Sequence, residues 1–311
     1  MGPGLDGHQG LNALTAVPAP VPGRSAGRRL ADLLHGRRRL QLGLLLAGPL
    51  GWLVIAYLGS LAVLFVAAFW HLDPFSGKIV HDYGTSNFET LWNGDVYRTI
   101  VLRTVGIAAA VTVTDAILAF PIAFYMAKIA TPRVRGLLVV AVLMPLWSSY
   151  LVKVYAWRTI LNEDGILNWA LDPFGMKGPG YGNVATWIVF SYLWLPYMIL
   201  PIYAGLERIP NSLLDASGDL GARPGKTFRH VVLPMALPAV VAGSIFTFSL
   251  TLGDYITPQL VSNTQFIGNV VYSNVGVANN LPLAAAFATV PVVIMVLYLL
   301  GARRVGAFEA L

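Results

Sequence analysis

The chain carries long apolar stretches separated by shorter polar segments. The first stretch runs from Leu40 to Trp70 and contains no Asp, Glu, Lys or Arg. A helix needs about 20 apolar residues to cross the hydrocarbon core of a bilayer, so this stretch is long enough to span one. Five further stretches are also long enough: residues 100–128, 136–158, 184–206, 232–254 and 281–302. The pattern predicts an all-α, polytopic membrane protein with six transmembrane helices.

The residues before the first apolar stretch form a separate segment. Residues 1–23 are rich in Gly, Pro and Ala, and residues 24–39 hold six arginines. We interpret residues 1–39 as a disordered, basic tail and residues 40–311 as the membrane domain. A signal peptide has an apolar region of only about 7–15 residues. The stretch from Leu40 is therefore interpreted as a transmembrane helix.

Composition supports this class and excludes several chemistries. The 311 residues are 56% hydrophobic and 12% charged, with a mean hydropathy of +0.65, whereas a soluble domain has about 25% charged residues. The absence of cysteine excludes disulfides and thiolate sites. The five histidines are scattered along the sequence, so we expect no metal site. The net charge of +6 comes from residues beside the apolar stretches, so we expect no nucleic acid partner.

The positive residues predict how the chain is oriented. Fifteen of the 21 Lys and Arg residues fall on one side of the six spans, in segments 24–39, 128–135, 208–229 and 303–304. Positive residues accumulate in cytoplasmic segments, so we expect both termini to be cytoplasmic. Two long loops, residues 71–97 and 159–183, are expected on the outer side. Prolines within the spans, at positions such as 121, 145 and 196, favour kinked helices.

The heptapeptide GARPGKT, residues 221–227, resembles the phosphate-binding loop of an ATPase. That loop requires four residues between its two glycines, because the backbone N–H groups must curl around the phosphates. Only three residues separate Gly221 from Gly225 here. The heptapeptide is also not preceded by an apolar strand. We conclude that this chain does not bind ATP through it.

The longest inner loop, residues 207–230, contains this heptapeptide. Asn211 or Ser212 is expected to cap a short amphipathic helix that ends near Leu220. Gly221 is well placed to end that helix in the left-handed conformation. A short amphipathic helix anchored at both ends by membrane spans suits docking into a groove of another protein.

The residues around this helix resemble the EAA signature of ABC importer permeases, E-A-A-x3-G-x9-I-x-L-P. Asp215, Ala216, Ser217 and Gly221 match it at the required spacing, and Val231-Val232-Leu233-Pro234 completes it. The departures are Asp for Glu at 215, Ser for Ala at 217 and Val for Ile at 231. The resemblance implies that the loop is a coupling helix docked on an ATPase. The implied coupling residues are Asp215, Ala216, Ser217, Gly221, Leu233 and Pro234.

The resemblance also implies a fold, partners and a location. Residues 144–157 and 252–261 look like segments of the spermidine/putrescine branch. The family implies the type I importer permease fold in a bacterial inner membrane. Its partners are a second permease, often non-identical, two ATPase subunits and an extracytoplasmic solute-binding protein. The chain itself would be non-catalytic and bind no cofactor, since ATP and Mg²⁺ belong to the ATPase.

Asp115 lies near the middle of the second predicted span. A carboxylate costs several kcal/mol there unless it is paired or hydrated. One interpretation is a contact for a cationic solute. The other is a structural hydrogen bond to a neighbouring helix, because Ala108, Thr112 and Ala119 form a small-residue face suited to close packing.

Asp254 and Tyr255 lie at the outer end of the fifth predicted span. A carboxylate beside an aromatic ring suits an ammonium group, through charge pairing and cation–π attraction. The alternative is that Asp254 caps the turn before Pro258. Further candidates for lining the path are Trp147, Tyr150 and Trp157, although such aromatic stripes also serve packing. Lys153 lies among them, where it can snorkel outward or pair with an acid.

Three alternatives to a polyamine permease remain at this stage. The solute could be a sugar, an opine or an organophosphate. A secondary transporter would predict inverted repeats, which the sequence does not show. A membrane-bound enzyme would need a nucleophile with a base, or a metal constellation, and neither pattern is present.

Overall fold

The computed structural model describes residues 38–307. It divides into two units, Met1–Leu61 and Ala62–Leu311. The described part of the first unit is helical, with α2 (Arg38–Trp52), η1 (Leu53–Leu58) and the start of α3 (Gly59–Ala67). Arg38 and Arg39, the last two residues of the segment that we interpreted as a tail, are therefore helical. Residues 1–37 lie outside the described part.

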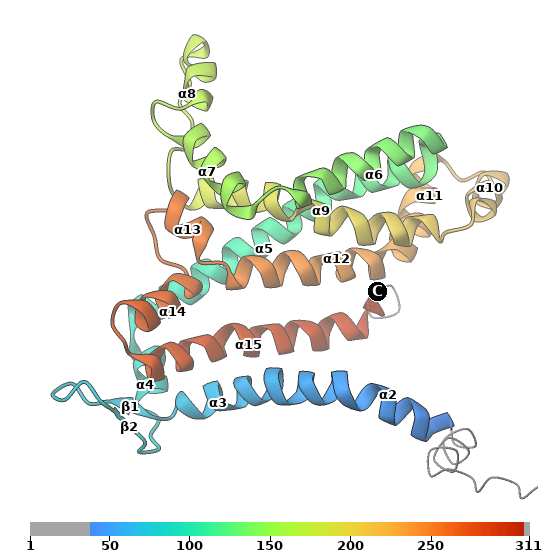
Figure 1. Cartoon of the computed structure of the whole chain (residues 1–311). Helices are drawn as coiled ribbons and strands as arrows, with labels where there is room; N and C mark the ends of the chain where they lie inside the picture. Colours follow the sequence, from blue (N-terminus) through green and yellow to red (C-terminus); the bar gives the residue numbers. More distant parts are fainter. Residues whose placement is uncertain (1–37, 308–311) are drawn as a thin grey trace, which may run out of the picture. The chain divides into compact units, whose positions relative to one another are not determined.

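The second unit contains the remaining elements, in an order that alternates long and short helices (Figure 1). Before the second span come β1 (His71–Leu72), β2 (Ile79–Val80) and α4 (Ser86–Asn93). The long helices are α5 (Asp95–Phe124), which continues as η2 (Tyr125–Ile129), α9 (Asn183–Glu207), α12 (Leu233–Gly253) and α15 (Leu281–Arg304). Between them lie α6 (Pro132–Trp147), α7 (Tyr150–Leu161), α8 (Ile166–Leu171), η3 (Asp172–Phe174), α10 (Asn211–Asp219), α11 (Pro224–Thr227), η4 (Phe228–Val232), α13 (Ile256–Val261) and α14 (Ile267–Gly276).

Five described helices are long and apolar enough to cross a membrane, and there are six such spans if one bent pair of helices is counted as a single span. The prediction of six spans agrees with this upper count, with one difference. The third, expected as one helix over residues 136–158, is two helices, α6 and α7, which meet at 90°. The backbone is extended at Ser148. Pro145 weakens the preceding turn because it has no N–H to donate.

Side chains satisfy a backbone group that this break leaves free. The carbonyl oxygen of Pro145 accepts the Ser148 hydroxyl at 2.8 Å and the Lys153 ammonium at 3.0 Å. The last carbonyls of a helix have no partner within it, so these two donors stabilise the end of α6. Lys153 is half-buried and bonds to backbone, rather than pairing with an acid.

Helices α5, α9 and α12 lie side by side and form the centre of the second unit (Figure 1). Small residues let them approach closely, as is typical of membrane helices. A Cβ atom added at Gly205 of α9 would lie 2.3 Å from the Cβ of Ala239 on α12. The contact between these two helices therefore requires a glycine at position 205.

The segments expected to be loops contain short elements. The predicted outer loop 71–97 holds β1 and β2, paired antiparallel with His71 opposite Val80, and then α4. The predicted loop 159–183 holds α8 and η3. Helices α13 and α14 follow α12, in a stretch that the hydrophobic pattern left unassigned. We call the end of this unit with α10 and α11 the α10 end, and the opposite end, with α4, α13 and α14, the α14 end (Figure 1).

Candidate functional site

The α10 end consists of a short helical hairpin, α10 and α11, between the long helices α9 and α12. Gly221 follows α10 with φ of 75°, so its predicted left-handed conformation is confirmed. The amide of Gly221 donates to the Gly218 carbonyl at 2.8 Å, and the amide of Ala222 donates to the Ser217 carbonyl at 3.1 Å. These bonds satisfy the last carbonyls of α10 and turn the chain sharply.

The predicted N-terminal cap of α10 is wrong. Pro210 occupies the cap position, with φ of −63° and ψ of 137°, and no side chain caps the helix there. Proline is preorganised for this position, because its fixed φ suits the entry to a helix. The side chain of Asn211 instead accepts a bond from Lys128 at 3.3 Å.

The hairpin is closed by a hydrogen bond between its two helices. The hydroxyls of Ser217 on α10 and Thr227 on α11 lie 2.8 Å apart. Asp215 and Ala216 are exposed, and Ser217 is half-buried by this contact. Leu220, at the tip, is 88% exposed. The hairpin thus has a defined shape and presents a large apolar side chain, which is what a docking element requires.

Leu233 and Pro234, the last two residues of the matched motif, begin α12 and are exposed. The helical backbone continues from η4 into α12 without a break, so Pro234 removes one backbone hydrogen bond there. The motif therefore extends from the exposed hairpin into a membrane-spanning helix.

The α14 end is organised around the carboxylate of Asp254, which follows α12. Its Oδ1 accepts the backbone amides of Ile256 at 2.7 Å and Thr257 at 3.1 Å. Its Oδ2 accepts the hydroxyl of Thr257 at 3.2 Å and the hydroxyl of Tyr150. The hydroxyls of Tyr150 and Thr257 are 2.6 Å apart. Asp254 therefore joins α7, α12 and α13 and caps the turn into α13.

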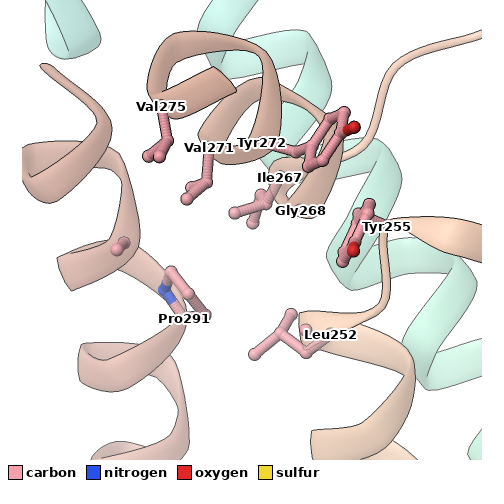
Figure 2. Close-up of a pocket in the computed structure, with 10 residues that line it drawn as sticks. Leu252, Tyr255, Ile267, Gly268, Val271, Tyr272, Val275 and Pro291 are labelled. Carbon is pink, nitrogen blue, oxygen red and sulfur yellow. The ribbon is translucent and has the colours of Figure 1, made fainter. Parts of the chain in front are cut away.

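An apolar cavity of about 380 Å³ lies beside Asp254, between α12, α14 and α15 (Figure 2). Tyr255 and Tyr272 lie at its edge with their rings stacked, 4.8 Å between centroids. A second cavity of about 330 Å³ shares Tyr272 but is lined by amides and hydroxyls, including Gln259, Asn263 and Asn269. Tyr272 thus lines both an apolar cavity and a polar, uncharged one.

Asp115 of α5 is fully buried against α9. Neither of its carboxylate oxygens has a hydrogen-bonding partner among the described residues, and the same holds for the hydroxyl of Ser191 on α9. Ser191 is nevertheless the polar neighbour of this carboxyl group. A buried polar atom without a partner costs about 1–3 kcal/mol. Asp115 is therefore costly to bury in this arrangement of the helices.

The structure brings together only part of the predicted path. Tyr150 contacts Asp254, whereas Trp157 packs on Tyr192 of α9 with 5.4 Å between ring centroids. Trp147, at the end of α6, is 86% exposed. Sequence reasoning missed Thr257 and Tyr272. Tyr272 carries no local signal, because its contact is with Tyr255 on a separate element. Thr257 does carry one, because it follows Asp254 by three residues, a spacing at which an Asp side chain can bond to the amide of the next turn.

Within residues 38–307, no group of three or more His, Cys, Asp or Glu side chains is arranged to hold a metal ion.

Comparison with known proteins gives a consistent result. Residues 97–306 match the family described as the binding-protein-dependent transport system inner membrane component. The chain is 48% identical to the inner membrane ABC transporter permease protein YdcU of Escherichia coli, over 97% of this chain and 99% of the relative. It is 31% identical to the spermidine/putrescine transport system permease protein PotB of Haemophilus influenzae, over 68% of this chain and 75% of that protein.

Solved structures show the same fold. A chain of a bacterial alginate ABC transporter, in complex with an alginate pentasaccharide-bound periplasmic protein, matches with a TM-score of 0.69 at 14% identity. The match covers 91% of this chain and 98% of that one. A chain of the MetNI methionine ABC transporter matches with a TM-score of 0.55 at 16% identity, over 72% of this chain and 98% of that one. The chain therefore belongs to the inner membrane component family of binding-protein-dependent transport systems, as a multi-pass ABC importer permease with the type I fold.

Proposed function

We propose that this permease moves a small cationic amine of the polyamine type across the inner membrane. The observation that carries the proposal is the similarity to PotB permeases, whose names state a spermidine/putrescine transport system. The protein from Haemophilus influenzae is 31% identical, and the one from Escherichia coli is 27% identical over 80% of this chain. The name of YdcU states no substrate. The solute assignment therefore rests on relatives of lower identity.

The chemistry of the α14 end supports a cationic solute. An ammonium group needs replacement partners when it leaves water, and a carboxylate beside aromatic rings supplies them. Asp254, Tyr255 and Tyr150 are the residues that we propose for this contact. The solute would have to displace the hydroxyl of Tyr150 or Thr257 from the Asp254 carboxylate, since four donors already occupy it. Trp147, Trp157 and Asp115 remain candidate path residues.

We assign the α10 end to the cytoplasm and propose that the hairpin docks on the ATPase. The exposed tip and the left-handed Gly221 support this assignment, as does the charge distribution of the sequence. Asp215, Ala216 and Ser217 would lie at the contact, while Leu233 and Pro234 would carry its movement into α12. The motif spacing had suggested the same residues.

The working importer requires other chains. We propose that it pairs with a second, non-identical permease, together with two ATPase subunits and an extracytoplasmic binding protein. ATP and Mg²⁺ would be used by the ATPase subunits, so this chain would perform no hydrolysis. Alternating access then depends on ATPase closure biasing two arrangements of the membrane helices.

A second solute class has one observation in its favour. The polar cavity beside Tyr272 is lined by Gln259, Asn263, Gln265 and Asn269, without a charged side chain. Amides and hydroxyls of this kind suit a neutral, hydroxyl-rich solute such as a sugar, because they can both donate and accept hydrogen bonds. In this case the Asp254 carboxylate would serve only to cap α13.

Uptake by the complete complex in proteoliposomes decides between these classes. We expect ATP-dependent uptake of radiolabelled putrescine or spermidine, and we expect Asp254→Asn to lower it roughly 10- to 150-fold through the loss of a charge-assisted bond. A matched control is Asp82→Asn, which removes one exposed carboxylate from the predicted outer loop 71–97. If the unmodified complex takes up neither amine, the polyamine assignment is wrong, while membership of the permease family stands.

A further inference from the structure

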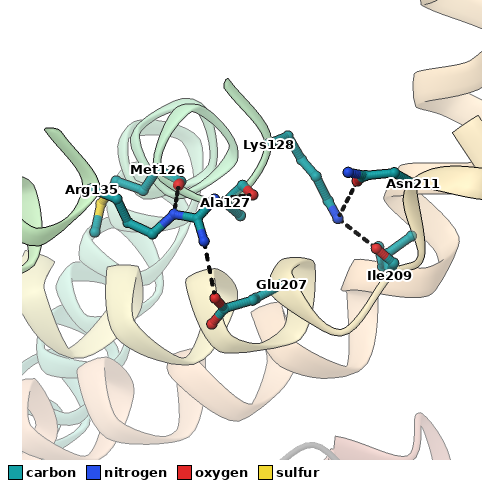
Figure 3. Close-up of polar contacts among 7 residues, drawn as sticks. All are labelled: Met126, Ala127, Lys128, Arg135, Glu207, Ile209 and Asn211. Carbon is teal, nitrogen blue, oxygen red and sulfur yellow. Dashed lines mark hydrogen bonds and ion pairs between the residues drawn. The ribbon is translucent and has the colours of Figure 1, made fainter. Parts of the chain in front are cut away.

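Two basic side chains join the α10 end into one network (Figure 3). Lys128, on η2, donates to the carbonyl of Ile209 at 2.5 Å and to the side chain of Asn211 at 3.3 Å. Arg135, on α6, donates to the carbonyls of Met126 at 3.0 Å and Ala127 at 3.3 Å. It also pairs with Glu207, at the end of α9, at 3.3 Å. We call Lys128 and Arg135, with these acceptors, the basic clamp.

The acceptors of the clamp are groups that the helices cannot satisfy alone. The last four carbonyls of a helix lack an intrahelical partner, and Met126 and Ala127 belong to the final turn of η2. Ile209 follows the end of α9 and is buried, so its carbonyl also needs a donor. Hydrogen bonds from an ionised donor are about twice as strong as neutral ones. The clamp therefore fixes where three helix ends lie relative to one another.

The hairpin is held at its other end by an aromatic contact. Phe228 of η4, which follows α11, packs edge-on against Phe120 of α5, with 5.4 Å between ring centroids. Leu214 of α10 packs on the buried cluster that includes Met126 and Ile209. Both ends of the hairpin thus rest on the continuous helix formed by α5 and η2. A displacement of α10 relative to that helix would break contacts at both ends.

Orientation of the chain alone does not explain these bonds. Arg133 lies two residues before Arg135, carries the same charge and is exposed, yet it makes no hydrogen bond or ion pair within residues 38–307. A positive charge in the cytoplasmic segment needs no partner in order to orient the chain. The specific bonding of Lys128 and Arg135 to backbone carbonyls therefore points to a mechanical role.

We propose that Lys128 and Arg135 are positioning residues that make the α10–α11 hairpin move as one body with η2 and the start of α6. Movement of the hairpin would then reach α5 and α6 through the clamp, as well as reaching α12 through the chain itself. This inference rests on the proposed docking of the hairpin on the ATPase, and it assigns the route by which that docking reaches the membrane helices.

Spin-label distance measurements test this proposal, because the chain has no cysteine of its own. Labels would be placed at Ser212→Cys on α10 and Leu137→Cys on α6, both at exposed positions. In the purified complex we expect one narrow distance, unchanged between the nucleotide-free state and the state trapped with ATP and vanadate. With Lys128→Met and Arg135→Gln together, a second distance should appear. Loss of one charge-assisted bond raises the detached population by roughly 10-fold or more.

Control variants distinguish loss of the clamp bonds from loss of a positive charge and from misfolding. Arg133→Gln removes the same charge as Arg135→Gln and should leave the distance unchanged. Lys128→Arg, made in place of Lys128→Met, keeps a donor toward Ile209. This variant should show the single distance of the unmodified protein. If the double variant does not fold, Lys128→Met alone still removes both bonds to the junction between α9 and α10.

Two results would overturn the proposal. One is a distance that stays single in the clamp variants, and the other is a native distance that shifts when ATP is trapped. Failure of the proposed docking would be recognised separately, because a crosslinker at the hairpin tip, Leu220→Cys, would then not capture the ATPase in a complex that retains it. The permease without ATPase would still report whether the clamp holds the hairpin.

Discussion

The two ends of the second unit hold their short helices by different means. At the α10 end, ammonium and guanidinium groups donate to backbone carbonyls in η2 and just after α9. At the α14 end, a single carboxylate accepts from two hydroxyls and two amides. The α14 end also contains an apolar and a polar cavity around the Tyr255–Tyr272 pair.

This difference agrees with the different tasks that we propose for the two ends. A docking element must keep its shape while it is pushed, and charge-assisted bonds to backbone serve that purpose. An end that admits a solute must exchange internal bonds for bonds to the solute. Hydroxyl groups on one carboxylate can be exchanged in this way, because each is a side chain that can rotate.

Among the predictions, a substitution at Gly221 in the α10 end should have the largest effect on transport. We predict that Gly221→Asp abolishes transport while membrane insertion stays intact. Aspartate and asparagine both tolerate the left-handed conformation, so the expected loss comes from the new acid, which would lie at the docking surface. Gly221→Asn is the matched control, because it adds a side chain of the same size without the charge. Full uptake by the Asp variant, with normal retention of the ATPase, would contradict the docking assignment.

Helices α9 and α12 both run between the two ends, and they pack against each other at Gly205. The substitution Gly205→Leu should disrupt this packing. The position has no room for a Cβ beside Ala239, and overpacking of this kind typically costs 1–3 kcal/mol. We expect a lower thermal unfolding midpoint in detergent. Gly136→Leu, on α6 where an added Cβ meets nothing within 4 Å, serves as the control. Equal midpoints for the two variants would show that the helices do not pack as described.

At the α14 end, Tyr150 and Asp254 should act as one unit. Asp254→Asn keeps an oxygen for the amides of Ile256 and Thr257 but replaces the oxygen that accepts from Tyr150. Tyr150→Phe removes the same bond from the other side. Each variant should lose about 1 kcal/mol of stability, and the double variant should lose no more than the larger of the two. Fully additive losses would mean that the bond contributes nothing.

The smallest effect is expected at Asp115. Asparagine fills the same space and removes the cost of burying a charge, so Asp115→Asn should keep or slightly raise the thermal midpoint. If Asp115 has only a structural role, solute uptake should stay within about twofold of the unmodified complex. A large loss of uptake without loss of stability would place Asp115 on the solute path after all.

Sequence predicted the α10 end better than the α14 end, for a physical reason. Gly221 acquires its conformation from the helix that directly precedes it, so spacing alone was enough to predict it. The contact between Tyr150 and Asp254 joins residues 104 positions apart, and no local pattern reports it. A kink at Pro145 was expected, but the full 90° break after Trp147 was not, because hydropathy continues across it although the backbone does not.

The capping of α10 shows how a local prediction can fail. Asn211 is a favoured capping residue, yet its side chain bonds to Lys128, which is distant in the sequence. Pro210 takes the cap position instead. The tertiary contact thus replaced the local one.

The central claim is that the α10–α11 hairpin is the surface on which the ATPase docks. Its most direct test uses the native absence of cysteine. A photoactivated crosslinker would be attached at Leu220→Cys, at the exposed tip, and at Tyr272→Cys, at the α14 end, in the purified complex. We predict that the ATPase subunit is captured from position 220 and not from position 272. Capture of the ATPase from position 272, or its absence at position 220 in a complex that retains it, would contradict the account.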